Sequence, residues 1–229
     1  VLTPRWRQPA RRLLPSGEVA AADANGDIGL LSRPIVTQIS RWDRLKGFAP
    51  LLDAFALLKR RLGEGAYDDG PPLRRRRVEL VRLVMAGPDP ASIPDDPEAL
   101  EVIESLKSAY VALPAEVQAD VAMLALPMES REQNALMVNA LQRASSLVVQ
   151  NSLREGFGLT VAEAMWKQIP VLTNRRACGP RQQIRDGVDG RLADDPEDAE
   201  ELCALLDRML ASPTEREVWG RNAQRRAYD

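Results

Sequence analysis

Residues 145–167 read SSLVVQNSLREGFGLTVAEAMWK, and the order of their parts predicts the class of fold. Residues 145–150 form the short apolar and β-branched run of a buried strand, and residues 161–168 have the composition of a helix. Gly156 and Gly158 lie between them, where glycine permits backbone conformations and close approaches that a side chain would block. A strand that runs through such a turn directly into a helix is the repeating unit of a sheet covered by helices.

The same alternation of strands and helices extends in both directions from this stretch. Further strands are predicted at residues 34–40, 78–87, 119–127 and 170–174. Helices are predicted at residues 49–62, 96–113, 132–144, 196–211 and 213–228, with a short one near Gln182. Regular alternation implies a parallel sheet with helices on both faces, so we expect an α/β fold with one doubly wound, Rossmann-like sheet.

The composition of the chain changes near residue 33. Residues 1–33 are rich in Pro, Arg and Gly and are predicted to be a lead-in or linker segment, whereas residues 34–229 form the single predicted domain. Residues 74–77 are four consecutive arginines beside Gly, Asp and Pro. Such a run is usually solvated, so we expect a surface insertion there and assign it no role.

The charge and hydropathy of the chain exclude several classes of function. Its 31 basic and 33 acidic residues give a net charge of −2, which does not mark a nucleic-acid binder. The apolar stretch 117–128 is interrupted by Asp120, and no other run approaches the ~20 apolar residues of a membrane span. The chain begins with Val rather than Met and lacks the apolar run of a secretory signal. We therefore expect a cytoplasmic protein, supplied as a trimmed piece.

The sequence contains no histidine, which removes the commonest general base and metal ligand. Its two cysteines, Cys178 and Cys203, have no metal or redox spacing, and we expect a loop thiol and a buried helix thiol. Any chemistry must therefore depend on carboxylates, cations and backbone amides, with no metal site.

Two glutamates flank the glycine-containing turn, at the end of a strand where open parallel sheets bind ligands. Glu155 lies beside both glycines, where a carboxylate contributes nothing to packing but can accept hydrogen bonds from sugar hydroxyls. Glu163 has a structural alternative, because Thr160 and Glu163 have the spacing of a capping box at the start of the helix. Taken without further context, the cap is the favoured interpretation of Glu163.

A pair of cations follows the first predicted strand, in the sequence SRWDRLKG at residues 40–47. Arg41 and Lys46 can turn toward the same cleft, where a guanidinium and an ammonium suit a phosphate whose charge grows as it leaves. The alternative is that Arg41 and Lys46 are ordinary solvated surface residues, and this is the favoured interpretation when each is considered separately. Two cations and two carboxylates at one edge of a sheet together favour a site.

Three segments of this chain resemble a known family: SRWDRLKG, NALQRASSLVVQNSLREGFGLTVAEAMWK and GPRQQIRDGVDGRL. Together they are similar to the carboxyl-terminal half of retaining GT-B glycosyltransferases of family four, and most similar to the trehalose synthase and trehalose phosphorylase type. The resemblance covers roughly residues 34–228. It implies that the predicted sheet is one half of a GT-B architecture, the half that binds a nucleoside diphosphate sugar.

The resemblance also implies roles for the residues singled out above. Glu155 and Glu163 match the E-x7-E motif, whose first glutamate lies by the donor sugar hydroxyls and whose second lies by the ribose. Arg41 and Lys46 match the two cations on the donor phosphates and, with Glu155, form the predicted catalytic group. The remaining predicted donor-binding residues share the segment that lies along the sugar and phosphate: Gly156, Phe157, Gly158, Leu159 and Thr160.

By resemblance, the expected reaction is transfer of glucose, with retained configuration, from a nucleoside diphosphate sugar to a sugar acceptor, with trehalose as the candidate product. The sugar nucleotide is a substrate, and no cofactor is expected. A phosphorylase that uses glucose 1-phosphate and phosphate is one alternative, and a non-catalytic sugar-nucleotide-binding module is another. We expect the acceptor side to come from a missing amino-terminal domain, so the chain alone should be inactive. Homo-oligomer formation is left open.

The sequence departs from the family pattern at two positions around the start of the third segment. Cys178 stands where the family usually has the first of two glycines, and Pro180 follows Gly179. Gln183 stands where many members carry a glutamate, and this feature, like NALQRAS at residues 139–145, resembles the trehalose branch.

Overall fold

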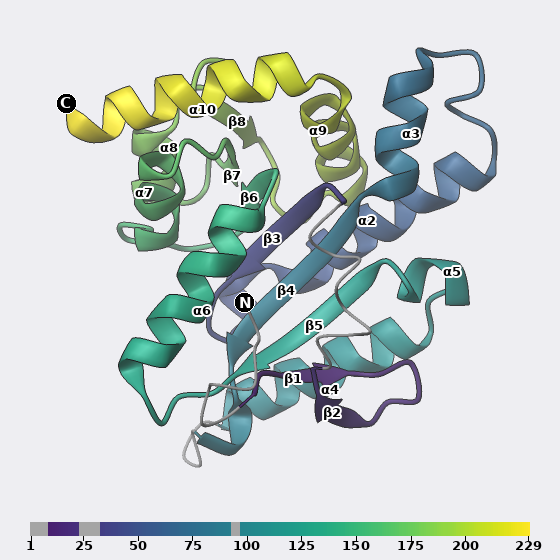
Figure 1. Cartoon of the computed structure of the whole chain (residues 1–229), viewed down its shortest axis with the longest axis vertical. Helices are drawn as coiled ribbons and strands as arrows, with labels where there is room; N and C mark the ends of the chain where they lie inside the picture. The colour runs from purple at the N-terminus through teal and green to yellow at the C-terminus, as the bar shows by residue number, and fades with distance from the viewer. Residues whose placement is uncertain (1–8, 23–32, 93–96) are drawn as a thin grey trace.

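The structure is a computed structural model of the 229-residue chain and describes residues 9–22, 33–92 and 97–229. Within them, eight strands form one sheet in the spatial order β2-β1-β5-β4-β3-β6-β7-β8 (Figure 1). The strands are β1 (Arg11–Leu13), β2 (Val19–Ala21), β3 (Ile35–Ile39), β4 (Arg82–Pro88), β5 (Val121–Leu126), β6 (Leu147–Val149), β7 (Val171–Asn174) and β8 (Gly190–Ala193).

Neighbouring strands from β5 to β8 pair in parallel, whereas β1 is antiparallel to both β2 and β5. The described helices of four residues or more are α2 (Phe48–Gly63), α3 (Pro72–Leu80), α4 (Pro97–Val111), α5 (Ala115–Gln118), α6 (Arg131–Ala144), α7 (Leu159–Trp166), α8 (Cys178–Gln183), α9 (Ala199–Ala211) and α10 (Pro213–Tyr228). Two single 3-10 turns, η2 (Arg44–Lys46) and η3 (Pro90–Ser92), follow β3 and β4. The predicted α/β class and doubly wound sheet are confirmed.

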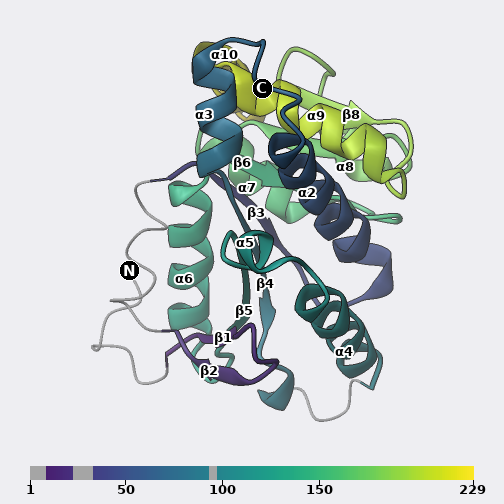
Figure 2. The ribbon, with the colours of Figure 1, turned by 90° about the vertical axis from the view of Figure 1, so that its right-hand side faces the viewer.

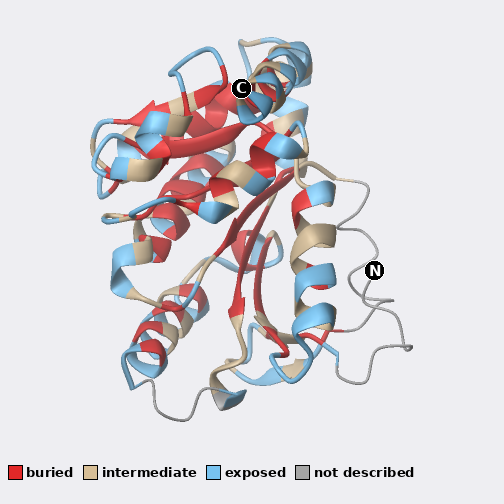
Figure 3. Cartoon of the chain, turned by 90° about the vertical axis from the view of Figure 1, so that its left-hand side faces the viewer, coloured by how far each residue is buried: buried red, intermediate tan, exposed pale blue. Residues whose placement is uncertain are grey.

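The alternation of side chains along each strand builds a separate apolar core on each face of the sheet. On β4, Leu83 and Met85 belong to the apolar cluster that includes α2, α4 and α9, whereas Val84 and Ala86 belong to the cluster that includes α6. Figure 2 shows the central strands between α6 on one side and α2 with α4 on the other. Buried residues concentrate along these strands and the inner faces of the helices (Figure 3). Both faces are covered, as a largely parallel sheet requires.

Three parts of the fold differ from the sequence prediction. Residues 78–80 end α3, so β4 begins only at Arg82. Residues 74–77 lie within α3 and remain at the surface as predicted, with Arg75 and Arg76 exposed, although Arg74 pairs with Asp207 of α9. The short strand β8 was not predicted at all. The alternation rule also missed β1 and β2, which lie within the predicted lead-in and extend the sheet beyond β5.

The two cysteines differ in exposure. Cys203 is buried in α9, as predicted, whereas Cys178 is exposed at the first position of α8 rather than in a loop. Among the residues that the structure describes, no helix is both long enough and apolar enough to cross a membrane.

The two longest helices each contain a glycine, and the two glycines have opposite surroundings. A Cβ atom at Gly220 in α10 would lie 2.0 Å from the carbonyl oxygen of Gln168, two residues after the end of α7. A Cβ atom at Gly63, the last residue of α2, would meet nothing within 4 Å. Gly220 therefore sets how closely α10 approaches the end of α7.

We expect Gly220→Ala to destabilise the chain by about 2 kcal/mol, because the backbone carbonyl it meets cannot move without displacing α7. Gly63→Ala is the matched control and should stabilise by about 0.5 kcal/mol, through reduced chain entropy in the unfolded state. Urea unfolding of both variants measures the difference. Equal effects of the two substitutions would show that α10 does not press on α7.

Candidate functional site

The candidate site lies where the direction of the sheet order reverses. From β3 the chain builds β4 and β5 on one side, and it then returns to place β6 on the other side of β3. The loops that follow β3 and β6 therefore leave their strands in opposite directions. Ligands bind at such a switch point in open α/β sheets, outside the carboxyl ends of the strands.

Lys46 and Glu155 meet at this switch point. The Nζ of Lys46 donates to Oε2 of Glu155 over 2.7 Å, although the two residues are 109 positions apart in sequence. Their side chains are only 14% and 21% exposed. The structure thus brings together a predicted cation and a predicted carboxylate in one partly buried ion pair.

Arg41 lies in the same loop but is much more accessible. Its side chain is 70% exposed, and its Nη2 is 3.7 Å from Oδ2 of Asp43. Asp43 has a local role as well, because its carboxylate caps η2 by accepting from the amide of Leu45. An exposed guanidinium with only one long contact can reorient toward an anion at little cost.

Two buried amide side chains that were not predicted hold these loops together. The Nε2 of Gln38 donates to the carbonyl of Lys46 over 2.7 Å, and its Oε1 accepts from the amide of Asn151. The Nδ2 of Asn151 donates to the carbonyls of Gly47 and Pro196. The available signal was a polar residue in an otherwise apolar strand, as in PIVTQIS, because a buried amide must find partners.

Gly47 permits the close contact between the two loops. It has a φ of 62°, and a Cβ atom there would lie 2.2 Å from the carbonyl oxygen of Asn151. Any side chain at this position would separate the loops that carry Lys46 and Glu155.

The glycine-containing turn forms the start of α7. Gly158 is the N-cap residue with a φ of 83°, and the helix begins at Leu159. The first amides of a helix have no intrahelical partner, and the helix dipole favours an anion beside them. A Cβ atom at Gly156 would meet nothing within 4 Å, so the turn is open on that side.

The segment that departs from the family pattern packs directly against this turn. A Cβ atom at Gly179 would lie 2.2 Å from the carbonyl oxygen of Gly156, and the ring of Pro180 lies against Gly158. The Nε2 of Gln183 donates to the carbonyl of Phe157. Pro180 is buried in the first turn of α8, a position that proline tolerates. The backbone of the turn therefore packs against three residues of α8: Gly179, Pro180 and Gln183.

The capping-box interpretation of Glu163 is wrong. Thr160 is the second residue of α7, and Gly158 occupies the cap position, so Glu163 has no cap to complete. Instead, Oε2 of Glu163 accepts from Nε2 of Gln142 on α6 over 2.8 Å. Gln142 is another contact residue of the site that sequence reasoning did not single out.

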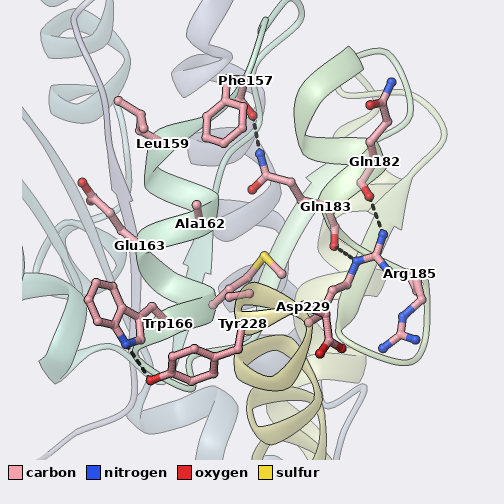
Figure 4. A pocket seen from close by; sticks show the side chains of 13 residues that line it. Phe157, Leu159, Ala162, Glu163, Trp166, Gln182, Gln183, Arg185, Tyr228 and Asp229 are labelled. Atoms are coloured by element: carbon pink, nitrogen blue, oxygen red, sulfur yellow. Dashed lines mark hydrogen bonds between the residues drawn. The ribbon is translucent and has the colours of Figure 1, made fainter.

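A cavity of about 840 Å³ lies beside α7 and is shown in Figure 4. Phe157, Leu159 and Trp166 line it and are all exposed, and the indole Nε1 of Trp166 donates to the hydroxyl of Tyr228. In the figure Glu163 extends from α7 on the side away from Gln183. Within the described ranges, no group of three or more Cys, Asp or Glu side chains is arranged to hold a metal ion.

The strand order, the switch-point site and the glycine turn into α7 define a Rossmann-like, ligand-binding domain. Residues 29–226 match the family model described as "Glycosyl transferases group 1". The chain belongs to this family.

The curated relatives with similar sequences include enzymes of trehalose metabolism. The chain is 34% identical over 194 aligned residues to trehalose synthase of Thermococcus litoralis. The alignment covers 85% of this chain and 40% of the relative. It is 26% identical over 193 aligned residues to trehalose phosphorylase of Grifola frondosa. That alignment covers 84% of this chain and 23% of the relative. The chain thus spans well under half the length of these relatives.

Solved structures show the same fold. Anabaena HepE in complex with UDP and glucose aligns with a TM-score of 0.60 at 21% identity, over 88% of this chain and 45% of that one. The carboxyl-terminal domain of LpcC from Francisella tularensis aligns with a TM-score of 0.55 at 19% identity, over 86% of this chain and 84% of that one. These likenesses place the described chain in one half of the GT-B architecture.

We expect Lys46 and Glu155 to stabilise the chain as a pair. Lys46→Met and Glu155→Gln should each destabilise it, since each leaves a partly buried group without its partner, and the double variant should cost less than the sum by about 1 kcal/mol. Urea unfolding of the three variants measures this coupling. Arg41→Met is the matched control, because its exposed side chain should contribute nothing measurable. Strictly additive losses for Lys46 and Glu155 would contradict the pairing.

Proposed function

We propose that this chain is the donor-binding half of a retaining glycosyltransferase. The enzyme transfers glucose from a nucleoside diphosphate sugar to a sugar acceptor, and trehalose is the candidate product. The observation that carries the proposal is the Lys46–Glu155 ion pair at the switch point, directly before the turn into α7. The 34% identity to a trehalose synthase supports the choice of product.

The roles of the cations follow from the charge that develops during transfer. When the bond between the anomeric carbon and the phosphate oxygen breaks, its electron pair leaves with the phosphate. Arg41, Lys46 and the amino terminus of α7 offset that charge. The ammonium of Lys46 has three donors, so it can keep its bond to Glu155 and still donate to the phosphate.

The carboxylates and the turn position the donor. Glu155 accepts hydrogen bonds from the sugar hydroxyls, and Glu163 accepts from the ribose. The backbone from Gly156 to Gly158, with Leu159 and Thr160 behind it, lies along the sugar and the phosphate. An acceptor hydroxyl then attacks the anomeric carbon from the face that the phosphate vacates and gives its proton to the leaving phosphate oxygen, so the configuration is retained. The sugar nucleotide is the substrate, and the proposed reaction uses no cofactor.

A trehalose phosphorylase is the second candidate function, and the similarity to the Grifola frondosa enzyme favours it. In that reaction the same two cations bind inorganic phosphate and glucose 1-phosphate. The nucleoside separates the two candidates, because a phosphorylase has no use for it. A non-catalytic sugar-nucleotide module is the third candidate, motivated by Cys178 and Pro180 in the segment under the turn.

The acceptor site belongs, in this proposal, to a second domain. The chain spans 40% of the length of the Thermococcus litoralis trehalose synthase. The partner domain would close over Glu155 and the turn from the opposite side of the cleft.

We expect Glu155→Gln to weaken binding of nucleoside diphosphate glucose about tenfold and to leave binding of the bare nucleoside diphosphate nearly intact, because the amide loses the charge and one acceptor. Thermal shifts with the uridine, adenosine and guanosine forms identify the donor, since a ligand at 100 times its dissociation constant adds about 2.7 kcal/mol of stability. Calorimetry on the best form then compares the two proteins. Equal losses for the sugar nucleotide and the bare nucleotide would remove the role assigned to Glu155.

We also expect the purified 229-residue chain to bind donor but to transfer no glucose above background. Transfer requires donor and acceptor to be held in near-attack geometry, and this advantage disappears when half of the cleft is missing. Release of nucleoside diphosphate in the presence of glucose measures the rate. Robust transfer that Glu155→Ala abolishes would show that the acceptor site lies within this chain.

A further inference from the structure

Glu163 and Lys167 are one helical turn apart at the site, and such a pair normally forms a direct salt bridge on a helix. Here a third side chain intervenes. Gln142 of α6 donates through Nε2 to Glu163 over 2.8 Å and accepts through Oε1 from Nζ of Lys167 over 2.5 Å. The amide of Gln142 therefore connects to both charges from the neighbouring helix.

The orientation of this amide is fixed by its two neighbours. A carboxylate only accepts hydrogen bonds and an ammonium only donates them, so the amide fits in one direction alone. Gln142 is 0% exposed, which leaves no water to satisfy it in another orientation. Burial lowers the pKa of Lys167 below its ordinary value, with a contribution from Arg143 that Glu163 opposes.

The contact leaves Glu163 with an accessible oxygen. Gln142 engages Oε2, while the Glu163 side chain as a whole remains exposed. A direct ion pair with Lys167 would draw the carboxylate down the helix and away from the turn at Gly158. A neutral amide holds the carboxylate without placing a cation on it, so its full acceptor strength is kept for a ligand.

We propose that Gln142 is a positioning residue, which holds the Glu163 carboxylate so that its free oxygen accepts from the ribose of the donor. Lys167 acts through Gln142 by fixing the direction of the amide. This inference rests on the proposed function, because it takes Glu163 to be the ribose contact. It predicts that preference for ribose over deoxyribose depends on a residue that touches no ligand.

The test measures that preference by calorimetry, using UDP, ADP and GDP and their 2′-deoxy counterparts. For the nucleotide that binds best, we expect the ribose form to bind about tenfold more tightly than the deoxy form, as one hydrogen bond to a charged group allows. Gln142→Leu should reduce this preference to about twofold, close to that of Glu163→Ala. Affinity for the deoxy form should not change. Lys167→Met should also reduce the preference for ribose, and this substitution changes no residue of the apolar core.

Gln118→Leu is the matched control, since Gln118 is also a buried glutamine but bonds backbone carbonyls of α4, away from the site. It should lose stability as Gln142→Leu does and keep the full ribose preference. Full preference in both Gln142→Leu and Lys167→Met would overturn the inference while leaving the proposed role of Glu163 intact. A wild-type chain that binds nucleotides without ribose preference, or a preference that survives Glu163→Ala, would instead overturn the role of Glu163 itself.

Discussion

The parallel pairing of β3 with β6 is the constraint on which the site depends. Val36 lies opposite Leu147 and Thr37 opposite Val148, so the two strands end side by side although β4 and β5 separate them in the chain. Because the following loops leave toward opposite sides, they open a crevice at the carboxyl end of the sheet. The Lys46–Glu155 contact across 109 residues is a consequence of that pairing.

Buried amides then determine how the pieces around this crevice fit. Gln38, Asn151 and Gln142 are each at most 1% exposed, and each has a hydrogen bond to a segment distant in sequence. A buried polar group costs free energy unless it is bonded, so each amide penalises arrangements in which its partner is elsewhere. Apolar packing brings the helices onto the sheet, whereas these amides specify which loop meets which. In the same way, we propose that Gln142 positions the carboxylate of Glu163 although Gln142 itself contacts no ligand.

Much of the fold could be predicted because long strands and helices have strong periodic patterns. The central strands β3 and β5, and helices such as α2 and α6, were predicted within a few residues of their observed bounds. The misses have physical causes. β8 has only four residues and begins with glycine, and the pairing of β1 with β5 is invisible to any local pattern. The surface location of the arginines in α3 was predicted, but the partner of Arg74 was not, because Asp207 lies 133 residues away.

The sequence by itself determined the alternating α/β class, the glycine turn before α7, and the identities of Lys46, Glu155 and Glu163 as candidate ligand contacts. The class, the turn, Lys46 and Glu155 follow from local spacing and from the chemistry of single side chains, whereas Glu163 became a candidate only through the family resemblance. Only the tertiary structure decided that Lys46 pairs with Glu155, that Arg41 remains exposed, and that Glu163 contacts Gln142 rather than capping a helix. The physical reason is that a hydrogen bond or ion pair depends on positions in space, which strand order and helix packing set, and not on distance along the chain.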